Sequence, residues 1–143
     1  MSVLLIEKKN IEEPMAWFRE AAQIAGNWQK DPLLNGYNLV SHGDTFYYCA
    51  ADDTETFFRF EDFSNNYFEF VDTAEMIDIA KGRELIFGYF SDDTCSAEFL
   101  HIKDGKCIRE FREYSDYPQD NVDLGCEPAF SSWADVASYV ERM

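Results

Sequence analysis

Short runs of aromatic and β-branched residues, separated by turn residues, restrict the fold of this chain more than any other feature. A first group predicts four strands, at residues 37–40, 46–49, 55–60 and 67–71. A second group predicts three more, at residues 84–90, 95–102 and 106–114. Runs of this kind, bounded by Asp, Asn, Ser and Gly, are typical of strands joined as hairpins in a meander. Most connections are too short for a parallel crossover, so we expect an antiparallel sheet.

The dipeptide Asp104-Gly105 is the strongest hairpin signal in the sequence. A type I′ turn requires a positive φ angle at both central positions, and Asp-Gly tolerates that conformation well. A two-residue loop would place Lys103 directly opposite Lys106, and like charges in that position are unfavourable. A longer loop is therefore an alternative, and the register of this hairpin stays open.

Helical patterns occupy three segments. Residues 12–26 have apolar side chains at helical spacing, with Pro14 in the opening turn and a glycine at the end. Asp72 and Glu75 have capping spacing before a short helix that ends near residue 82. Ser132 caps a final helix, in which we expect Trp133 to be largely buried. The stretch 115–128 is too irregular to predict an element.

These elements predict an α+β fold. An antiparallel β-sheet of about six or seven strands would be covered on one side by the N- and C-terminal helices, because an apolar sheet face requires a second layer. A chain of 143 residues is long enough for a self-sufficient core. We therefore expect residues 1–143 to form a single domain.

The charge balance limits the possible partners. The chain has 28 acidic residues against 12 Lys and Arg, a net charge of −16, while 46% hydrophobic residues exclude a disordered chain. Direct nucleic-acid binding is not expected, since neutralising phosphates requires clustered basic residues. Attraction to an anionic membrane is disfavoured for the same reason, and no apolar run is long enough to span a bilayer.

The N-terminus and the cysteines predict a cytoplasmic protein. The apolar run at residues 3–6 precedes its basic residues, the reverse of a secretory signal. No C-x-x-C pair is present, so we expect four free thiols, although two disulfides in a secreted chain are an alternative. The four cysteines are Cys49, Cys95, Cys107 and Cys126.

The sequence predicts no catalytic residues, no cofactor and no metal site. His42 and His101, the two histidines, could join two cysteines around zinc, but no local ligand pair is present. Cys126 could serve a small cysteine-dependent enzyme if the fold supplied a histidine, and this remains an alternative. Three aspartates, at positions 116, 120 and 123, lack the alternate spacing of a helix-loop-helix calcium site. We expect a protein that is not an enzyme.

Two acidic stretches predict a surface that binds a basic protein. Residues 44–78 contain ten acidic residues and one basic residue, and residues 113–141 contain seven acidic residues and no basic one. Such a field steers association, and interleaved tyrosines can anchor the partner, although a solvated face is the simpler interpretation of either cluster. The predicted contact residues are Asp52, Asp53, Glu55, Glu61, Asp62, Tyr67, Asp116, Tyr117, Asp120 and Asp123.

The C-terminal segment resembles immunity proteins of bacterial polymorphic-toxin and contact-dependent growth inhibition systems. The residues that carry this resemblance are Gly125, Cys126, Glu127, Pro128, Phe130, Trp133, Asp135 and Val136. The resemblance implies a cytoplasmic protein that binds the toxic domain of a cognate toxin and blocks its active site or groove. The acidity of this chain indicates a basic, nuclease-type toxin as the partner. A phage-type inhibitor that mimics DNA is the alternative among binding proteins.

Overall fold

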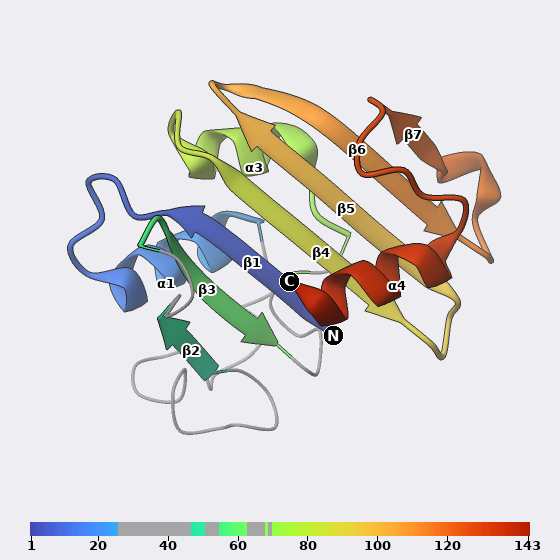
Figure 1. The fold of residues 1–143 in the computed structure, drawn as a ribbon, viewed down its shortest axis with the longest axis horizontal. Helices are drawn as coiled ribbons and strands as arrows, with labels where there is room; N and C mark the ends of the chain where they lie inside the picture. Colours follow the sequence, from blue (N-terminus) through green and yellow to red (C-terminus); the bar gives the residue numbers. More distant parts are fainter. Residues whose placement is uncertain (26–46, 51–54, 63–67, 69) are drawn as a thin grey trace.

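The computed structural model describes residues 1–25, 47–50, 55–62, 68 and 70–143. Its strands are β1 (Ser2–Glu7), β2 (Tyr47–Ala50), β3 (Phe57–Asp62), β4 (Leu85–Ser91), β5 (Ser96–Lys103), β6 (Lys106–Tyr114) and β7 (Val122–Leu124). Its helices are α1 (Pro14–Ala25), α3 (Thr73–Ala80), the 3₁₀ turn η3 (Pro118–Asp120) and α4 (Trp133–Arg142) (Figure 1). The predicted strand at residues 37–40 lies outside the described part of the chain.

The strands form one seven-stranded antiparallel sheet in the order β2-β3-β1-β4-β5-β6-β7. The predicted α+β class is therefore confirmed, and the seven strands of the described residues agree with the predicted six or seven. Strand β1 was not predicted, yet it lies inside the sheet between β3 and β4. Both of its faces are covered, with Val3 buried on one and Leu4 on the other. A strand buried on both faces gives a continuous apolar run instead of an alternating pattern.

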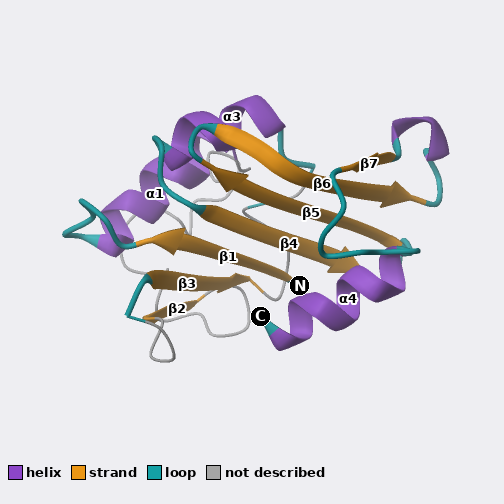
Figure 2. Ribbon diagram, turned by 45° about the horizontal axis from the view of Figure 1, so that its top comes forward, coloured by secondary structure: helices purple, strands orange, loops and turns teal. Residues whose placement is uncertain are grey.

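Helices cover the sheet on both faces. Helices α1 and α3 pack on one face, and α4 packs on the opposite face (Figures 1 and 2). The expectation that both terminal helices share one side is wrong. Successive β1 side chains explain this, because Leu4 and Ile6 enter the core under α1 and α3 while Val3 enters the core under α4. Two apolar faces require two covering layers.

A group of packed aromatic rings lies within the core under α1 and α3. The Phe18 ring of α1 lies 4.7 Å from Phe60 and 5.3 Å from Phe68, measured between ring centroids. Phe68 in turn lies 6.1 Å from Phe87 of β4. Aromatic pairs at these separations gain stability beyond the area that they bury. The contacts join strands β3 and β4 to the helical layer.

The core under α4 depends on a close approach between helix and sheet. A Cβ atom added at Gly88 of β4 would lie 2.4 Å from Cγ2 of Val140. Only glycine lets the helix approach this closely without displacing Val140. The buried α4 side chains are Val136, Ala137 and Val140, whereas Trp133 is half-buried at the edge of the core. Trp133 is therefore less buried than its position after the cap suggested.

The β5–β6 hairpin has the two-residue loop that Asp104-Gly105 predicts. The φ angles are 52° at Asp104 and 76° at Gly105, and Lys103 pairs with Lys106 across the strands. The register then shifts between His101 and Ile102, which leaves Ile108 of β6 without a paired residue. This β-bulge fixes which β6 side chains lie opposite those of β5.

Two other predictions from the sequence require correction. Residues 67–71 were expected to form a strand, but their described members lie in bends and irregular backbone. Phe70 there has a φ angle of 55°, which no regular strand contains. Residues 115–128, expected to lack any element, contain η3 and β7. Tyr114 N–H donates to the Asn121 side chain over 2.8 Å, which stabilises the turn between β6 and β7.

Candidate functional site

A hollow of about 400 Å³ opens on the α1/α3 face, near the C-terminal end of β6. It is lined by Phe70, Arg112, Tyr114, Tyr117 and Asp120. These residues come from the segment before α3, from β6 and from the loop between β6 and β7. The volume lies in the range of small-molecule binding sites. Tyr117 and Asp120 are two of the contact residues predicted from the sequence.

Arg112, the buried charged residue among those that line this hollow, forms its floor and belongs to a buried ion pair. Glu98 of β5 is fully buried and lies directly opposite Arg112 of β6. Nη1 of Arg112 donates to Oε2 of Glu98, and the Tyr114 hydroxyl donates to the same oxygen over 2.7 Å. Oε1 of Glu98 accepts from the backbone N–H of Phe70 over 2.7 Å. Both carboxylate oxygens are therefore satisfied, as a buried charge requires.

The remaining nitrogens of Arg112 also bind acceptors of the protein itself. Nε donates to the Glu110 carboxylate over 2.8 Å, and Nη2 donates to the Thr73 hydroxyl over 3.0 Å. Arg112 thus joins β6 to β5 and to the first residue of α3. An arginine held in this way is a structural cation and does not offer an open fork to an external anion.

Burial shifts the pKa values of Glu98, Tyr114 and Arg112 in this cluster. Burial raises the pKa of the Glu98 carboxyl, and Arg112 and the hydrogen bonds that Glu98 accepts oppose that rise. Burial and the neighbouring Glu98 charge raise the pKa of the Tyr114 hydroxyl. Burial is the largest single influence on Arg112 and lowers its pKa, but the Glu98 charge and the contacts with Tyr114 and Glu110 together raise the pKa by more, so the net shift is upward. Arg112 therefore stays charged, and Tyr114 stays a neutral hydrogen-bond donor.

Two exposed aromatic side chains stand at the hollow. Phe70 is 59% exposed and Tyr117 is 58% exposed, although both are large aromatics. The Phe70 ring lies 5.6 Å from Tyr114 and 6.3 Å from Tyr89, between centroids. Its positive φ angle is uncommon outside glycine and costs of order 1–3 kcal/mol. The hydrogen bond to buried Glu98 holds the Phe70 backbone in this conformation.

A second buried arginine, on the other face of the sheet, fixes strand β7 and the segment that follows it. Nε of Arg109 donates to the Pro128 carbonyl over 2.8 Å, and Nη1 donates to the Leu124 carbonyl over 2.8 Å. Nη1 also pairs with the Asp123 carboxylate at 2.6 Å. The guanidinium lies 5.4 Å from the centroid of the Phe130 ring. Arg109 thereby holds the segment from β7 to Pro128 against the sheet.

The predicted contact residues fall into two groups in the structure. Asp116, Tyr117 and Asp120 are exposed together on the β6–β7 loop, and Asp123 is exposed but paired with Arg109. Glu55 is exposed before β3, and Asp62 is the last residue of β3. Strands β3 and β7 are five sheet steps apart, roughly 24 Å at ordinary strand spacing. Asp52, Asp53 and Tyr67 lie outside the described residues.

Glu61 does not lie on the surface as a partner contact would. It is only 7% exposed and forms an ion pair with Arg59 within β3. Its register partner in β1 is Val3, which belongs to the core under α4. Nε of Arg59 also donates to the backbone carbonyl of Met143 over 3.2 Å. The Glu61 carboxylate is therefore paired within the protein and is not exposed as a partner contact.

Phe70, Glu98 and Arg112 were not identified from the sequence. Glu98 and Arg112 are charged residues within predicted strands, and a charge at an inward position was the one available signal. Their pairing depends on the β-bulge, which local sequence rules do not place. Phe70 was assigned to a strand, where its exposure at a bend could not be foreseen.

The thiol of Cys107 and the imidazole of His101 each contact another group of the protein. The thiol of Cys107 donates to the Arg109 carbonyl over 3.2 Å, and burial raises its pKa, which disfavours the reactive thiolate. Nε2 of His101 lies 2.7 Å from the Glu84 carboxylate. Cys95, Cys107 and Cys126 are free thiols, and the Cys49 side chain lies outside the described part. Within the described residues no group of three or more potential ligands could hold a metal ion.

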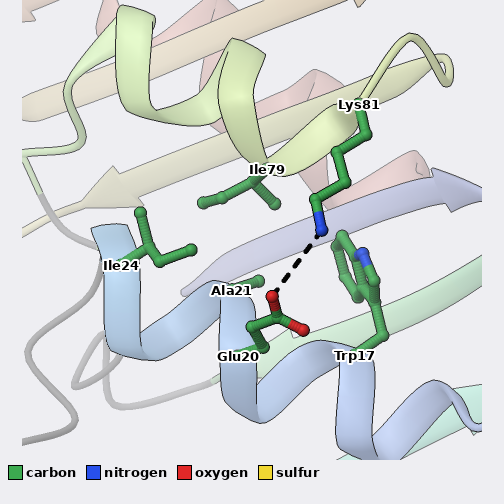
Figure 3. A pocket seen from close by; sticks show the side chains of 6 residues that line it. All are labelled: Trp17, Glu20, Ala21, Ile24, Ile79 and Lys81. Carbon is green, nitrogen blue, oxygen red and sulfur yellow. Dashed lines mark ion pairs between the residues drawn. The ribbon is translucent and has the colours of Figure 1, made fainter.

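A second cavity, between α1 and α3, is too small for a substrate. Its volume is about 10 Å³, roughly the space for one water molecule. Figure 3 shows Trp17, Ile24 and Ile79 around it, with the Glu20–Lys81 ion pair across its opening at 3.7 Å. This cavity is a packing gap between two helices.

Comparisons with protein-family models, curated proteins and solved structures found no match to this chain. Among the helices that the structure describes, none combines the length and apolar character needed to cross a bilayer.

Proposed function

We propose that this protein is an immunity-type inhibitor, which binds and neutralises a basic protein domain of the nuclease-toxin class. The observation that carries the proposal is the exposed acidic β6–β7 loop beside a hollow with two exposed aromatic side chains. Asp116 and Asp120 supply negative charge, while Phe70 and Tyr117 offer apolar contact area. Protein-binding surfaces combine these two features, since aromatics anchor and charges steer.

The mechanism is electrostatic capture followed by occlusion of the toxin groove. A chain with a net charge of −16 attracts a basic partner, and this attraction raises the association rate at low salt. Once the partner has docked, desolvated aromatic contacts slow its dissociation. The basic groove that would otherwise bind nucleic acid is then covered by protein. The inhibitor needs no cofactor and no catalytic residue, and it acts in the cytoplasm.

The loop is suited to this role because the fold holds it in place. Arg109 holds β7 through Asp123 and the Leu124 carbonyl, and the Tyr114 N–H donates to the Asn121 side chain, so Asp116 and Asp120 project from a loop that is anchored at both ends. Holding a binding loop before the partner arrives lowers the entropy cost of association. Arg109 is almost fully buried, so a partner does not compete for it.

Affinity capture from the source cell, followed by reconstitution, tests the proposal. Immobilised wild-type protein is compared with the Asp116→Asn/Asp120→Asn variant and with a control of equal charge change, Glu12→Gln/Glu13→Gln. Both control positions are exposed and precede α1. We expect a basic partner whose purified enzymatic activity falls on addition of the wild type and of the control. Weaker inhibition by the loop variant is also expected. A partner whose activity is unchanged by saturating wild-type protein would contradict the proposal.

A further inference from the structure

We infer that the hollow lined by Phe70, Arg112, Tyr114, Tyr117 and Asp120 receives a single arginine side chain of the partner protein. The inference rests on the proposed function and names the chemistry of its central contact. The assignment rests on three features of the hollow. Two aromatic side chains are exposed, one carboxylate is exposed, and Arg112 at the floor already donates its hydrogen bonds within the protein.

The walls of the hollow have the character of a cation site. Phe70 and Tyr117 are each more than half exposed, so their ring surfaces are available to a ligand. Aromatic faces attract cations, and the planar guanidinium of arginine stacks on them better than a compact ammonium does. The volume of about 400 Å³ leaves room for such a side chain.

The charges around the hollow also favour a cation. Asp120 is exposed and forms no ion pair with a described basic residue, so its carboxylate is available. Arg112 is positive, but it pairs with both Glu98 and Glu110 and is 8% exposed. One positive group, Arg112, and three carboxylates, Asp120, Glu98 and Glu110, together have a net charge of −2. An anionic ligand would therefore be repelled, and a guanidinium would be attracted.

The strained backbone at Phe70 sets one wall before any partner binds. Its positive φ angle persists because Glu98, fixed by Arg112 and Tyr114, accepts the Phe70 N–H. Strained residues that the surrounding fold holds in place concentrate at binding sites. Glu98 and Arg112 are therefore positioning residues for the aromatic wall.

Backbone-amide NMR of the whole isotope-labelled protein tests this inference with three small probes. The probes are N-acetyl-arginine amide, N-acetyl-lysine amide and N-acetyl-citrulline amide, the last being a neutral analogue of arginine. We expect saturable shift changes at Phe70, Tyr117 and Asp120 with the arginine probe. The lysine probe should bind several-fold more weakly, and the citrulline probe should leave these amides unchanged.

Two variants and a control sharpen the result. Tyr117→Ala and Asp120→Asn should each weaken binding of the arginine probe at least threefold, while Glu12→Gln should leave it unchanged. Both tested side chains are exposed, so the variants are expected to fold. Equal shifts with arginine and citrulline, or shifts elsewhere only, would overturn the inference. Inhibition of the basic partner is measured separately, and its persistence in that case would leave the proposed function standing.

Discussion

Arg109 and Arg112, three residues apart on β6, are buried on opposite faces of the sheet and have different partners. Arg109 binds backbone carbonyls, together with the exposed carboxylate of Asp123. Arg112 binds the buried carboxylate of Glu98 and the half-buried carboxylate of Glu110. One arginine therefore holds a loop, and the other completes a charged cluster beneath a hollow.

Arg109 and Arg112 therefore support the protein surface in two different ways. Removal of Arg109 would leave neutral backbone carbonyls without their donor, together with the Asp123 carboxylate, which is exposed and can be solvated by water. Removal of Arg112 would leave the Glu98 charge buried without its cation. The second loss is larger, because an uncompensated buried charge costs more than an unpaired neutral group.

The largest effect on stability is expected from Arg112→Leu. The variant should lose about 3–5 kcal/mol of unfolding free energy, since it isolates buried Glu98. Denaturant unfolding monitored by circular dichroism measures this loss. The double variant Glu98→Leu/Arg112→Leu is the matched control and should recover most of it, because both buried charges are then absent. A double variant no more stable than Arg112→Leu would contradict this account of the pair.

A smaller effect is expected from Arg109→Leu. The variant should lose about 1–3 kcal/mol, the cost of buried polar groups left without a donor. Hydrogen exchange should accelerate at backbone amides of residues 115–127, whereas amides of β4 should retain their protection. Equal acceleration across the whole sheet would show that Arg109 stabilises the entire domain and does not act through the loop.

The same β6 region shows what could be predicted from sequence and what could not. Asp104-Gly105 predicted its hairpin, because the turn depends on the φ preferences of two adjacent residues. An unbulged register from that turn would place Glu98 opposite Phe111, yet the observed partner is Arg112. The extra residue at Ile108 causes the change. The Glu98–Arg112 pair at the floor of the hollow therefore depends on this β-bulge, which local sequence patterns do not predict.

Other differences have similar physical causes. The helices at residues 14–25, 73–80 and 133–142 follow from local caps and apolar spacing, and all three were predicted. Strand β1 was missed because its two buried faces remove the alternation that identifies a strand. The exposed acidic loop was predicted from composition alone, whereas the aromatic wall at Phe70 depends on its long-range bond to Glu98.

The pH dependence of stability sharpens the account of the Glu98 cluster. Burial raises the pKa of folded Glu98 above its ordinary value of 4.5, so the folded state binds this proton more tightly than the unfolded state does. That stabilisation is complete below the unfolded pKa and is lost as pH rises through the folded pKa. The free energy of unfolding of wild type minus that of Glu98→Gln should therefore fall as pH rises from about 4.5. A difference that grows with pH would mean that Arg112 outweighs burial.

The smallest effect on stability is expected from Asp116→Asn/Asp120→Asn. Both side chains are exposed, so the variant should stay within about 0.5 kcal/mol of the wild type. Thermal unfolding checks this result against Glu12→Gln/Glu13→Gln. A large loss of stability would show that these carboxylates support the fold, and they would then not be free for a partner.

The most direct test of the account is stopped-flow association with the purified basic partner at several ionic strengths. Wild-type association should slow steeply as salt rises to about 0.15 M, where the Debye length is about 8 Å. The loop variant Asp116→Lys/Asp120→Lys should associate more slowly at low salt and respond less to salt, with a smaller change in dissociation. The control Glu12→Lys/Glu13→Lys should stay close to the wild type. A salt-independent wild-type rate, or a loop variant that matches its control, would contradict electrostatic capture through the β6–β7 loop.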